Sequence, residues 1–137
     1  EARFGAVPDL MAEPGRRLDE RANELASKDT LVSRKSADDL HCWVYLDIGR
    51  FSGLAETEGE AIRYQLVTCH DGSESAPSVL AGPSCDSVDI LYETRPVNFP
   101  LSSRCGDKVM IRNCGAYTSS YSSVGFNGFP PLDVVVL

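Results

Sequence analysis

Residues 41–48 read HCWVYLDI, and this stretch indicates the fold most clearly. β-Branched and aromatic residues dominate it, which is typical of strands rather than helices. Neighbouring side chains of a strand point to opposite faces, so Trp43, Tyr45 and Asp47 are expected on one face. The alternate positions should then face the other way: Cys42, Val44, Leu46 and Ile48.

Similar short apolar segments, separated by glycine, proline and polar residues, lie on both sides of this stretch. They are 30–33, 62–69, 78–81, 87–92, 108–113 and 132–136. Many short strands and little helix favour a mainly β fold, a Greek-key β-barrel or β-sandwich. Residues 134–137 (VVVL) are apolar at every position, which predicts a central strand buried on both faces.

The N-terminal part has a different pattern. Residues 7–12 form a short apolar run, which predicts a strand that ends at the turn 13–16 (EPGR). Residues 17–28 (RLDERANELASK) are rich in helix formers, which predicts a short helical segment. We therefore expect two parts, residues 1–28 with the turn and the helix, and residues 29–137 as a β-domain.

Length and charge limit the function. The 137 residues suffice for one domain, and the net charge of -7 disfavours nucleic acid and anionic membranes as partners. There is no apolar run of about 18 residues and no leader-like start, so no membrane span or signal peptide is expected. The acidity is compatible with a cationic substrate, although an acidic surface also simply keeps a protein in solution.

The chain contains five cysteines, an odd number at irregular spacing. This disfavours a disulfide framework and favours a reducing compartment, which predicts a cytoplasmic protein. Two pairs, 41–42 (HC) and 69–70 (CH), contain metal-ligand residue types. Both lie in strand-like segments, where each pair would place one ligand on each face, so no metal site is expected.

Two polar motifs can carry chemistry. In the turn 13–16, a Pro-Gly pair lets backbone N–H groups approach an anion, and Arg16 adds positive charge. In the segment 82–89 (GPSCDSVD), the Cys85 thiol can move a proton and the Asp86 carboxylate can bind an ammonium group. A plain turn and a loop with a structural cysteine are the alternatives.

Two aromatic motifs follow. In 115–118 (GAYT), small residues flank Tyr117, whose hydroxyl can bind a phosphate or whose ring can simply pack in the core. In 125–130 (GFNGFP), Phe126 and Asn127 lie in a glycine-bounded loop that can form a pocket wall or a hydrophobic turn.

The order EPGR, GPSCDSVD, GDKVMIRNCGAYT and FNGF resembles the pyridoxal-phosphate (PLP) decarboxylases of ornithine, lysine and diaminopimelate. The stretches SRKSADD and WVYLDIGRFSGLAET resemble the bacterial ornithine/lysine members in particular. The resemblance implies a C-terminal β-domain that follows an α/β barrel, with residues 1–28 as the end of the barrel domain. It also implies PLP as the cofactor, a basic amino-acid substrate and a head-to-tail homodimer whose active sites contain residues of both subunits.

The resemblance also implies roles for the cofactor-side residues. Glu13 would face the pyridine nitrogen of PLP and keep it protonated, which maintains the electron sink. Gly15, Arg16 and Tyr117 would bind the cofactor phosphate.

On the substrate side, Cys85 would reach across the dimer and reprotonate the α-carbon after CO₂ leaves. Asp86 would bind the distal ammonium of the substrate, and Phe126 and Asn127 would wall the pocket. Asp47 is a weaker match to a second substrate-binding aspartate, because its position is shifted by one residue.

The family's cofactor lysine has no match, since the three lysines, Lys28, Lys35 and Lys108, lie outside that motif. The chain alone is therefore expected to be inactive. Two interpretations follow. The chain is part of an ornithine or lysine decarboxylase that needs a barrel domain or second subunit, or it is a non-catalytic module that binds or regulates an intact decarboxylase. The charged residues Asp19, Glu20, Arg21 and Glu24 motivate the second.

Overall fold

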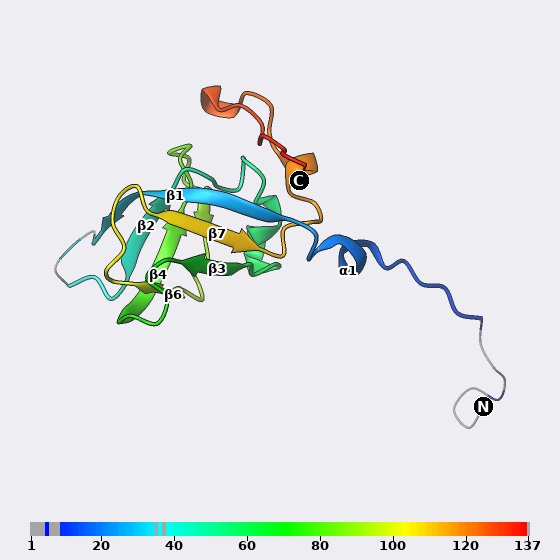
Figure 1. Ribbon diagram of the computed structural model, residues 1–137, viewed down its shortest axis with the longest axis horizontal. Coiled ribbons are helices and arrows are strands. Elements are labelled where there is room, and N and C mark those ends of the chain that lie inside the picture. The colour runs from blue at the N-terminus through cyan, green and yellow to red at the C-terminus, as the bar shows by residue number, and fades with distance from the viewer. Residues whose placement is uncertain (1–4, 6–8, 35, 37, 137) are drawn as a thin grey trace.

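The computed structural model describes residues 5, 9–34, 36 and 38–136. They form a mainly β fold with one curled, seven-stranded sheet and a short N-terminal helix (Figure 1), as the sequence predicts. The helix α1 is Gly15–Asp19. The strands are β1 Glu24–Ser33, β2 Cys42–Leu46, β3 Gln65–Thr68, β4 Ser75–Ala81, β5 Ile90–Leu91, β6 Val97–Pro100 and β7 Lys108–Arg112. Three short 3-10 helices are η1 Ala55–Glu60, η2 Ser119–Tyr121 and η3 Phe126–Gly128.

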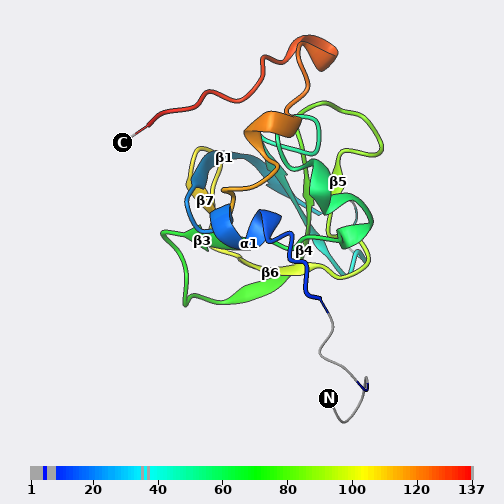
Figure 2. The same ribbon diagram turned by 90° about the vertical axis from the view of Figure 1, so that its right-hand side faces the viewer.

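The sheet has the strand order β3-β7-β1-β2-β4-β5, and β6 also pairs with β4. The β2–β4 pair is parallel and the other pairs are antiparallel. The first half of β1 pairs with β7 and the second half with β2, and the register shifts between Asp29 and Leu31. Such an irregularity bends a strand, so β1 curls the sheet into a half-barrel (Figure 2).

The strand around 41–48 has the two faces that its alternation predicts. Val44 and Leu46 are fully buried in the main core, which also contains Ile48 and Phe99. Trp43 packs on the opposite face in a smaller cluster with other β2 and β4 residues: Tyr45, Val79 and Ala81. The predicted segments 30–33, 62–69, 78–81, 87–92 and 108–113 likewise contain all or part of β1, β3, β4, β5 and β7.

The helix expected over residues 17–28 is wrong beyond Asp19, where α1 ends, and Glu24–Lys28 belong to β1. Their backbone pairs with β7, Leu25 packs against the main core and Ser27 is buried. Helix propensity is a weak preference that tertiary pairing overrides. The strand β1 also runs through the expected division between residues 28 and 29.

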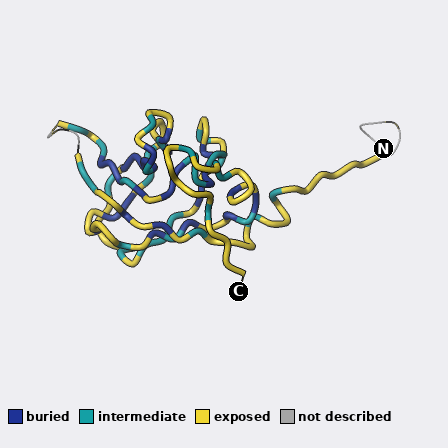
Figure 3. Tube along the Cα trace, turned by 90° about the horizontal axis from the view of Figure 1, so that it is seen from above, coloured by how far each residue is buried: buried dark blue, intermediate teal, exposed yellow. Residues whose placement is uncertain are grey.

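The predicted C-terminal strand is also wrong. Residues 132–136 form no regular element, and Val134 and Val136 are 65% and 92% exposed (Figure 3). No strand of the described sheet pairs with them. Apolar residues are buried only where other groups pack on them, and the described residues leave Val134 and Val136 largely exposed. Residue 137, the last of this predicted strand, lies outside the described residues. Of the strand predicted over 7–12, residues 7 and 8 lie outside the described residues and 9–12 form no regular element.

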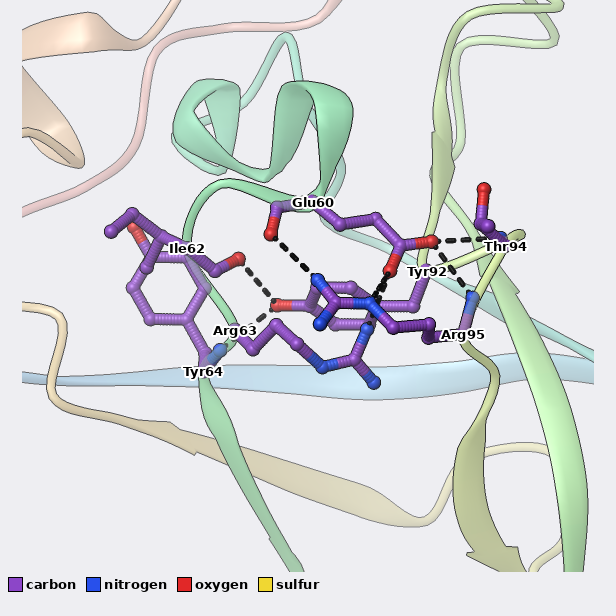
Figure 4. A network of polar contacts seen from close by, with 7 residues as sticks. All are labelled: Glu60, Ile62, Arg63, Tyr64, Tyr92, Thr94 and Arg95. Carbon is purple, nitrogen blue, oxygen red and sulfur yellow. Dashed lines mark hydrogen bonds and ion pairs between the residues drawn. The ribbon is translucent and has the colours of Figure 1, made fainter.

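A polar network holds the connection after η1 to the β5–β6 connection (Figure 4). The two carboxylate oxygens of Glu60 accept hydrogen bonds from the backbone N–H groups of Thr94 and Arg95, at 2.7 and 3.0 Å, and from the Arg95 side chain. An ion pair with Arg63 at 2.8 Å completes the set. Burial raises the pKa of Glu60, but hydrogen bonds from Arg95 and Thr94 outweigh this and lower it below 4.5.

Glu60→Gln is expected to lower the free energy of unfolding at pH 7 by about 1–2 kcal/mol, because it removes the charged acceptor. The folded-state pKa lies below the unfolded one, so this contribution exists above the unfolded pKa and is lost as pH falls through the folded one. Urea unfolding between pH 3 and pH 7 should therefore show the free energies of unfolding of wild type and variant converging as the pH falls below 4.5. A constant difference across this range would contradict the assignment.

No described helix has the length and apolarity needed to cross a membrane.

Candidate functional site

The first group of predicted site residues lies where α1 meets the segment after β7. A side-chain carbon at Gly15 would come within 3.3 Å of the Tyr117 hydroxyl. The guanidinium carbon of Arg16 lies 5.6 Å from the centre of the Tyr117 ring. The structure thus brings together residues about a hundred positions apart in the sequence.

Gly115 explains why these two segments meet. Its N–H donates to the carbonyl of Glu20 at 3.0 Å, and the Cys114 N–H donates to the carbonyl of Asn23 at 3.1 Å. The backbones are so close that a Cβ at position 115 would overlap the carbonyl of Asp19. The absence of a side chain at Gly115 therefore lets the Tyr117 segment lie against the end of α1.

Gly115→Ala is expected to destabilise the chain by about 1–3 kcal/mol, because its methyl group meets backbone that cannot rotate away. The shift should also separate Tyr117 from Gly15. A chemical denaturation curve checks the first effect, and NMR shifts of the Gly15 and Arg16 amides check the second. Gly72→Ala is a control for the added methyl, since nothing lies within 4 Å of it, although its positive φ adds local strain. Equal stability of wild type and Gly115→Ala would contradict the packing.

An open groove of about 490 Å³ lies beside this group, and Arg16, Arg21 and Arg63 line it together with Tyr64. Glu20 also lines the groove and Arg63 is already paired with Glu60, so the groove carries charges of both signs. Arg16 forms an ion pair with Glu56, which orients it. Burial raises the pKa of Tyr64, although the positive charge of Arg16 opposes this.

Glu13 is exposed and has no hydrogen bond or ion pair among the described residues. The structure does not bring it into contact with Tyr117.

The second group is organised by a buried carboxylate, Asp89, which is 2% exposed. It accepts hydrogen bonds from the Arg50 N–H at 2.7 Å, the Ser84 N–H at 3.2 Å and the Ser84 hydroxyl at 2.6 Å. A Cβ at Gly49 or Gly82 would overlap this carboxylate. Asp89 ends the motif 82–89, but no role was predicted for it, because its closeness to two glycines exists only in the fold.

Cys85 and Asp86 follow directly on this anchored turn. Cys85 is exposed, and its thiol donates a weak bond to the Pro83 carbonyl at 3.8 Å. One oxygen of Asp86 accepts from the Val88 N–H at 2.9 Å. The other has no hydrogen-bond partner among the described residues, so it can accept from a ligand.

The loop with Phe126 and Asn127 packs on the same turn. The Asn127 side-chain amide donates to the Ser84 carbonyl at 2.8 Å, and the Phe126 ring stacks on Phe51 with centres 4.0 Å apart. Hydrogen bonds therefore connect Asp89 to Ser84 and Ser84 to Asn127. This places the Cys85–Asp86 turn beside the aromatic loop, as the predicted substrate-side set requires.

Three predicted site residues, Cys85, Tyr117 and Asn127, have left-handed backbone with φ of 58°, 55° and 48°. Residues other than glycine adopt this conformation uncommonly, and it recurs at functional sites. Asp47 belongs to neither group. Its carboxylate accepts from the Ser27 hydroxyl at 2.7 Å and the Lys28 N–H at 2.9 Å, which connects the loop after β2 to β1. No described hydrogen bond or ion pair joins the two groups directly.

Cys69 and His70 do not lie in a strand, in contrast to the prediction. The strand β3 ends at Thr68, and both residues lie in the following turn rather than on opposite faces of a strand. Their ligand atoms and a carboxylate oxygen of Asp107 lie within 4.8 Å of one another. All five cysteines are unpaired, and Cys42 and Cys114 are buried.

Comparison with known proteins identifies similar domains. A family model described as the C-terminal sheet domain of pyridoxal-dependent decarboxylases matches residues 24–115. The lysine/ornithine decarboxylase of Selenomonas ruminantium is 33% identical over 120 residues, which cover 88% of this chain and 28% of the relative. A probable ornithine decarboxylase of Dictyostelium discoideum is 27% identical over 93% of this chain and 30% of its own length.

Solved structures of decarboxylases contain a domain with a similar fold. The lysine/ornithine decarboxylase of Vibrio vulnificus complexed with cadaverine superposes with a TM-score of 0.75 at 32% identity, over 90% of this chain and 32% of that one. A diaminopimelate decarboxylase at 20% identity and a TM-score of 0.69 shares the fold. The chain thus spans about a third of the length of the proteins it resembles.

Proposed function

This chain belongs to the pyridoxal-dependent decarboxylase family, whose C-terminal sheet domain it contains, and we propose that it serves an enzyme that decarboxylates ornithine or lysine. Its part is to supply one set of residues to the cofactor and another to the substrate. The observation that carries the proposal is the contact of Gly15 and Arg16 with Tyr117 across the fold.

The first group suits the phosphate end of PLP. Gly15 leaves room beside the Tyr117 hydroxyl, and Arg16 supplies positive charge at the edge of a groove lined by arginines. In this proposal Gly15, Arg16 and Tyr117 bind the phosphate, and the unpartnered Glu13 carboxylate pairs with the pyridine nitrogen. When bound, PLP supplies the electron sink for loss of CO₂.

The second group suits the substrate. The free oxygen of Asp86 binds the distal ammonium of a diamino acid, and the exposed Cys85 thiol delivers a proton to the α-carbon. Phe126 and Asn127 form the wall beside them. Because no described hydrogen bond or ion pair joins this group to the cofactor group, we propose that the two serve different active sites of a homodimer, with Cys85 and Asp86 contributed to the partner's site.

The covalent chemistry requires a lysine that we place in a barrel domain outside the 137 residues, so the chain alone is proposed to be inactive. Asp47 is not proposed as a substrate ligand, since β1 engages its carboxylate. We retain the cytoplasm as the proposed location, with neither nucleic acid nor membrane as a partner.

A chimera tests this proposal. The barrel part of the Selenomonas ruminantium enzyme is joined to this chain, and PLP absorbance and CO₂ release are measured with lysine, ornithine and diaminopimelate. We expect bound PLP and activity with lysine or ornithine, and none with diaminopimelate, whose second carboxylate would face Asp86. Arg16→Met should weaken PLP binding, whereas Arg17→Met, at an exposed neighbouring position, should not. A folded chimera that binds PLP but releases no CO₂ from any of the three would contradict the proposal.

A further inference from the structure

Three side chains with metal-ligand chemistry meet at one end of the sheet. Cys69 and His70 lie in the turn after β3, and Asp107 directly precedes β7. One ligand atom from each lies within 4.8 Å of the other two, and the His70 Nε2 is 2.8 Å from an oxygen of Asp107. This cluster has no part in the decarboxylase chemistry proposed above.

The sheet register explains why a further carboxylate lies behind the cluster. Lys28 of β1 pairs with Lys108 of β7, so Asp29 lies opposite Asp107. The Asp29 N–H donates to the Asp107 carbonyl at 2.9 Å, and the Gly106 N–H donates to the Asp29 carbonyl at 2.7 Å. These two bonds hold the backbone of Asp29 against the turn that carries Asp107.

Asp29 is 1% exposed, and neither of its carboxylate oxygens has a hydrogen-bond partner among the described residues. A buried carboxylate without a partner is unfavourable unless a cation or a proton compensates it. A cation bound by the cluster beside Asp29 would supply this compensation.

We propose that Cys69, His70 and Asp107 bind a divalent transition-metal ion, with Zn²⁺ the best match to a thiolate, an imidazole and a carboxylate. Three protein ligands leave a fourth position for water, as in open zinc sites. Mg²⁺ and Ca²⁺ prefer all-oxygen ligands, so they should bind more weakly. On binding, the Cys69 thiol releases its proton to solvent and forms the metal–sulfur bond.

The atoms present allow the small movement that coordination requires. Cys69 is exposed, and about 29% of each of the His70 and Asp107 side chains is exposed, so their side chains can rotate toward a common centre. Asp107 keeps a hydrogen bond from the Arg104 N–H, at 2.8 Å, which holds the carboxylate in position. The bound ion would connect the turn after β3 to the turn before β7.

Co²⁺ and Zn²⁺ titrations of the 137-residue chain test this site. One Co²⁺ per chain should bind and give a thiolate-to-metal charge-transfer band in the near ultraviolet, and Zn²⁺ should displace it. Zn²⁺ should also raise the melting temperature. We expect Cys69→Ser and His70→Ala each to weaken Zn²⁺ binding by about 10-fold or more, the usual effect of losing a ligand or its support. Asp29→Asn should weaken Zn²⁺ binding by about 3-fold or more, because it removes a negative charge close to the bound cation.

Matched controls exist in the same chain. Cys105→Ser removes another exposed thiol, and His41→Ala removes the other histidine, and neither belongs to the cluster. Both should bind Zn²⁺ like wild type. Failure to bind one ion per chain, a missing charge-transfer band, or unchanged affinity in Cys69→Ser or His70→Ala would overturn the proposal. Because these measurements need no PLP and no barrel domain, they are independent of the decarboxylase proposal.

Discussion

Asp89→Ala is expected to lower the free energy of unfolding by about 3–5 kcal/mol, because three donors lose their buried acceptor at once. The donors are two backbone N–H groups, of Arg50 and Ser84, and the Ser84 hydroxyl. Gly49 and Gly82 lie against the carboxylate, so its removal also leaves a small polar void. Urea unfolding followed by the fluorescence of Trp43 would measure the loss.

Asp89→Asn keeps the shape and one acceptor oxygen, so its loss should be smaller, about 1–2 kcal/mol. This variant provides the measurement if Asp89→Ala does not fold. Asp86→Ala is the matched control, because it removes a neighbouring carboxylate that is only partly buried and accepts from one N–H at 2.9 Å. If Asp89→Asn and Asp86→Ala both matched wild type, the anchoring role of Asp89 would be wrong.

Cys85→Ala in the chimeric enzyme is expected to lower kcat for diamine formation by about 10²–10⁴-fold, the range for loss of a positioned proton donor. The thiol is exposed and bonds only weakly to Pro83, so its removal should leave the fold intact. PLP binding should also be unchanged, because Cys85 lies in the group that does not contact Arg16 or Tyr117. Steady-state kinetics and the PLP absorbance spectrum separate the two effects.

Cys105→Ser is the control, since it removes an exposed thiol that belongs to neither proposed group. Its kcat should equal that of the unmodified chimera. A Cys85→Ala enzyme with unchanged kcat would show that another group delivers the proton. A Cys85→Ala enzyme that loses PLP would show instead that Cys85 contributes to the cofactor site.

The sequence predicted best where one local rule decides the structure. The alternation in residues 41–48 predicted both faces of β2, because the two-residue period of a strand is a property of the backbone itself. The motifs around Cys85, Tyr117 and Phe126 predicted the family, which the match over residues 24–115 confirms. The roles of the individual residues remain predictions.

The sequence failed where a residue's state depends on a partner far along the chain. Residues Glu24–Lys28 suit a helix locally, yet pairing with β7 makes them a strand. The run 134–136 is apolar enough to be buried, yet no described strand pairs with it. The strand predicted over 62–69 ends at Thr68 in the structure, so Cys69 and His70 follow it and the alternation of a strand does not apply to them.

By itself, then, the sequence determined that this chain belongs to the family of C-terminal sheet domains of pyridoxal-dependent decarboxylases, and it proposed which side chains carry chemistry. Only the tertiary structure decided which of them meet. It placed Tyr117 on Gly15 and Arg16, connected Asn127 through Ser84 to Asp89, and brought His70 and Asp107 together near the unpaired Asp29. The physical reason is that local patterns follow from backbone geometry, whereas contacts between distant residues follow from strand register and from the close approach of backbones at glycines such as Gly115.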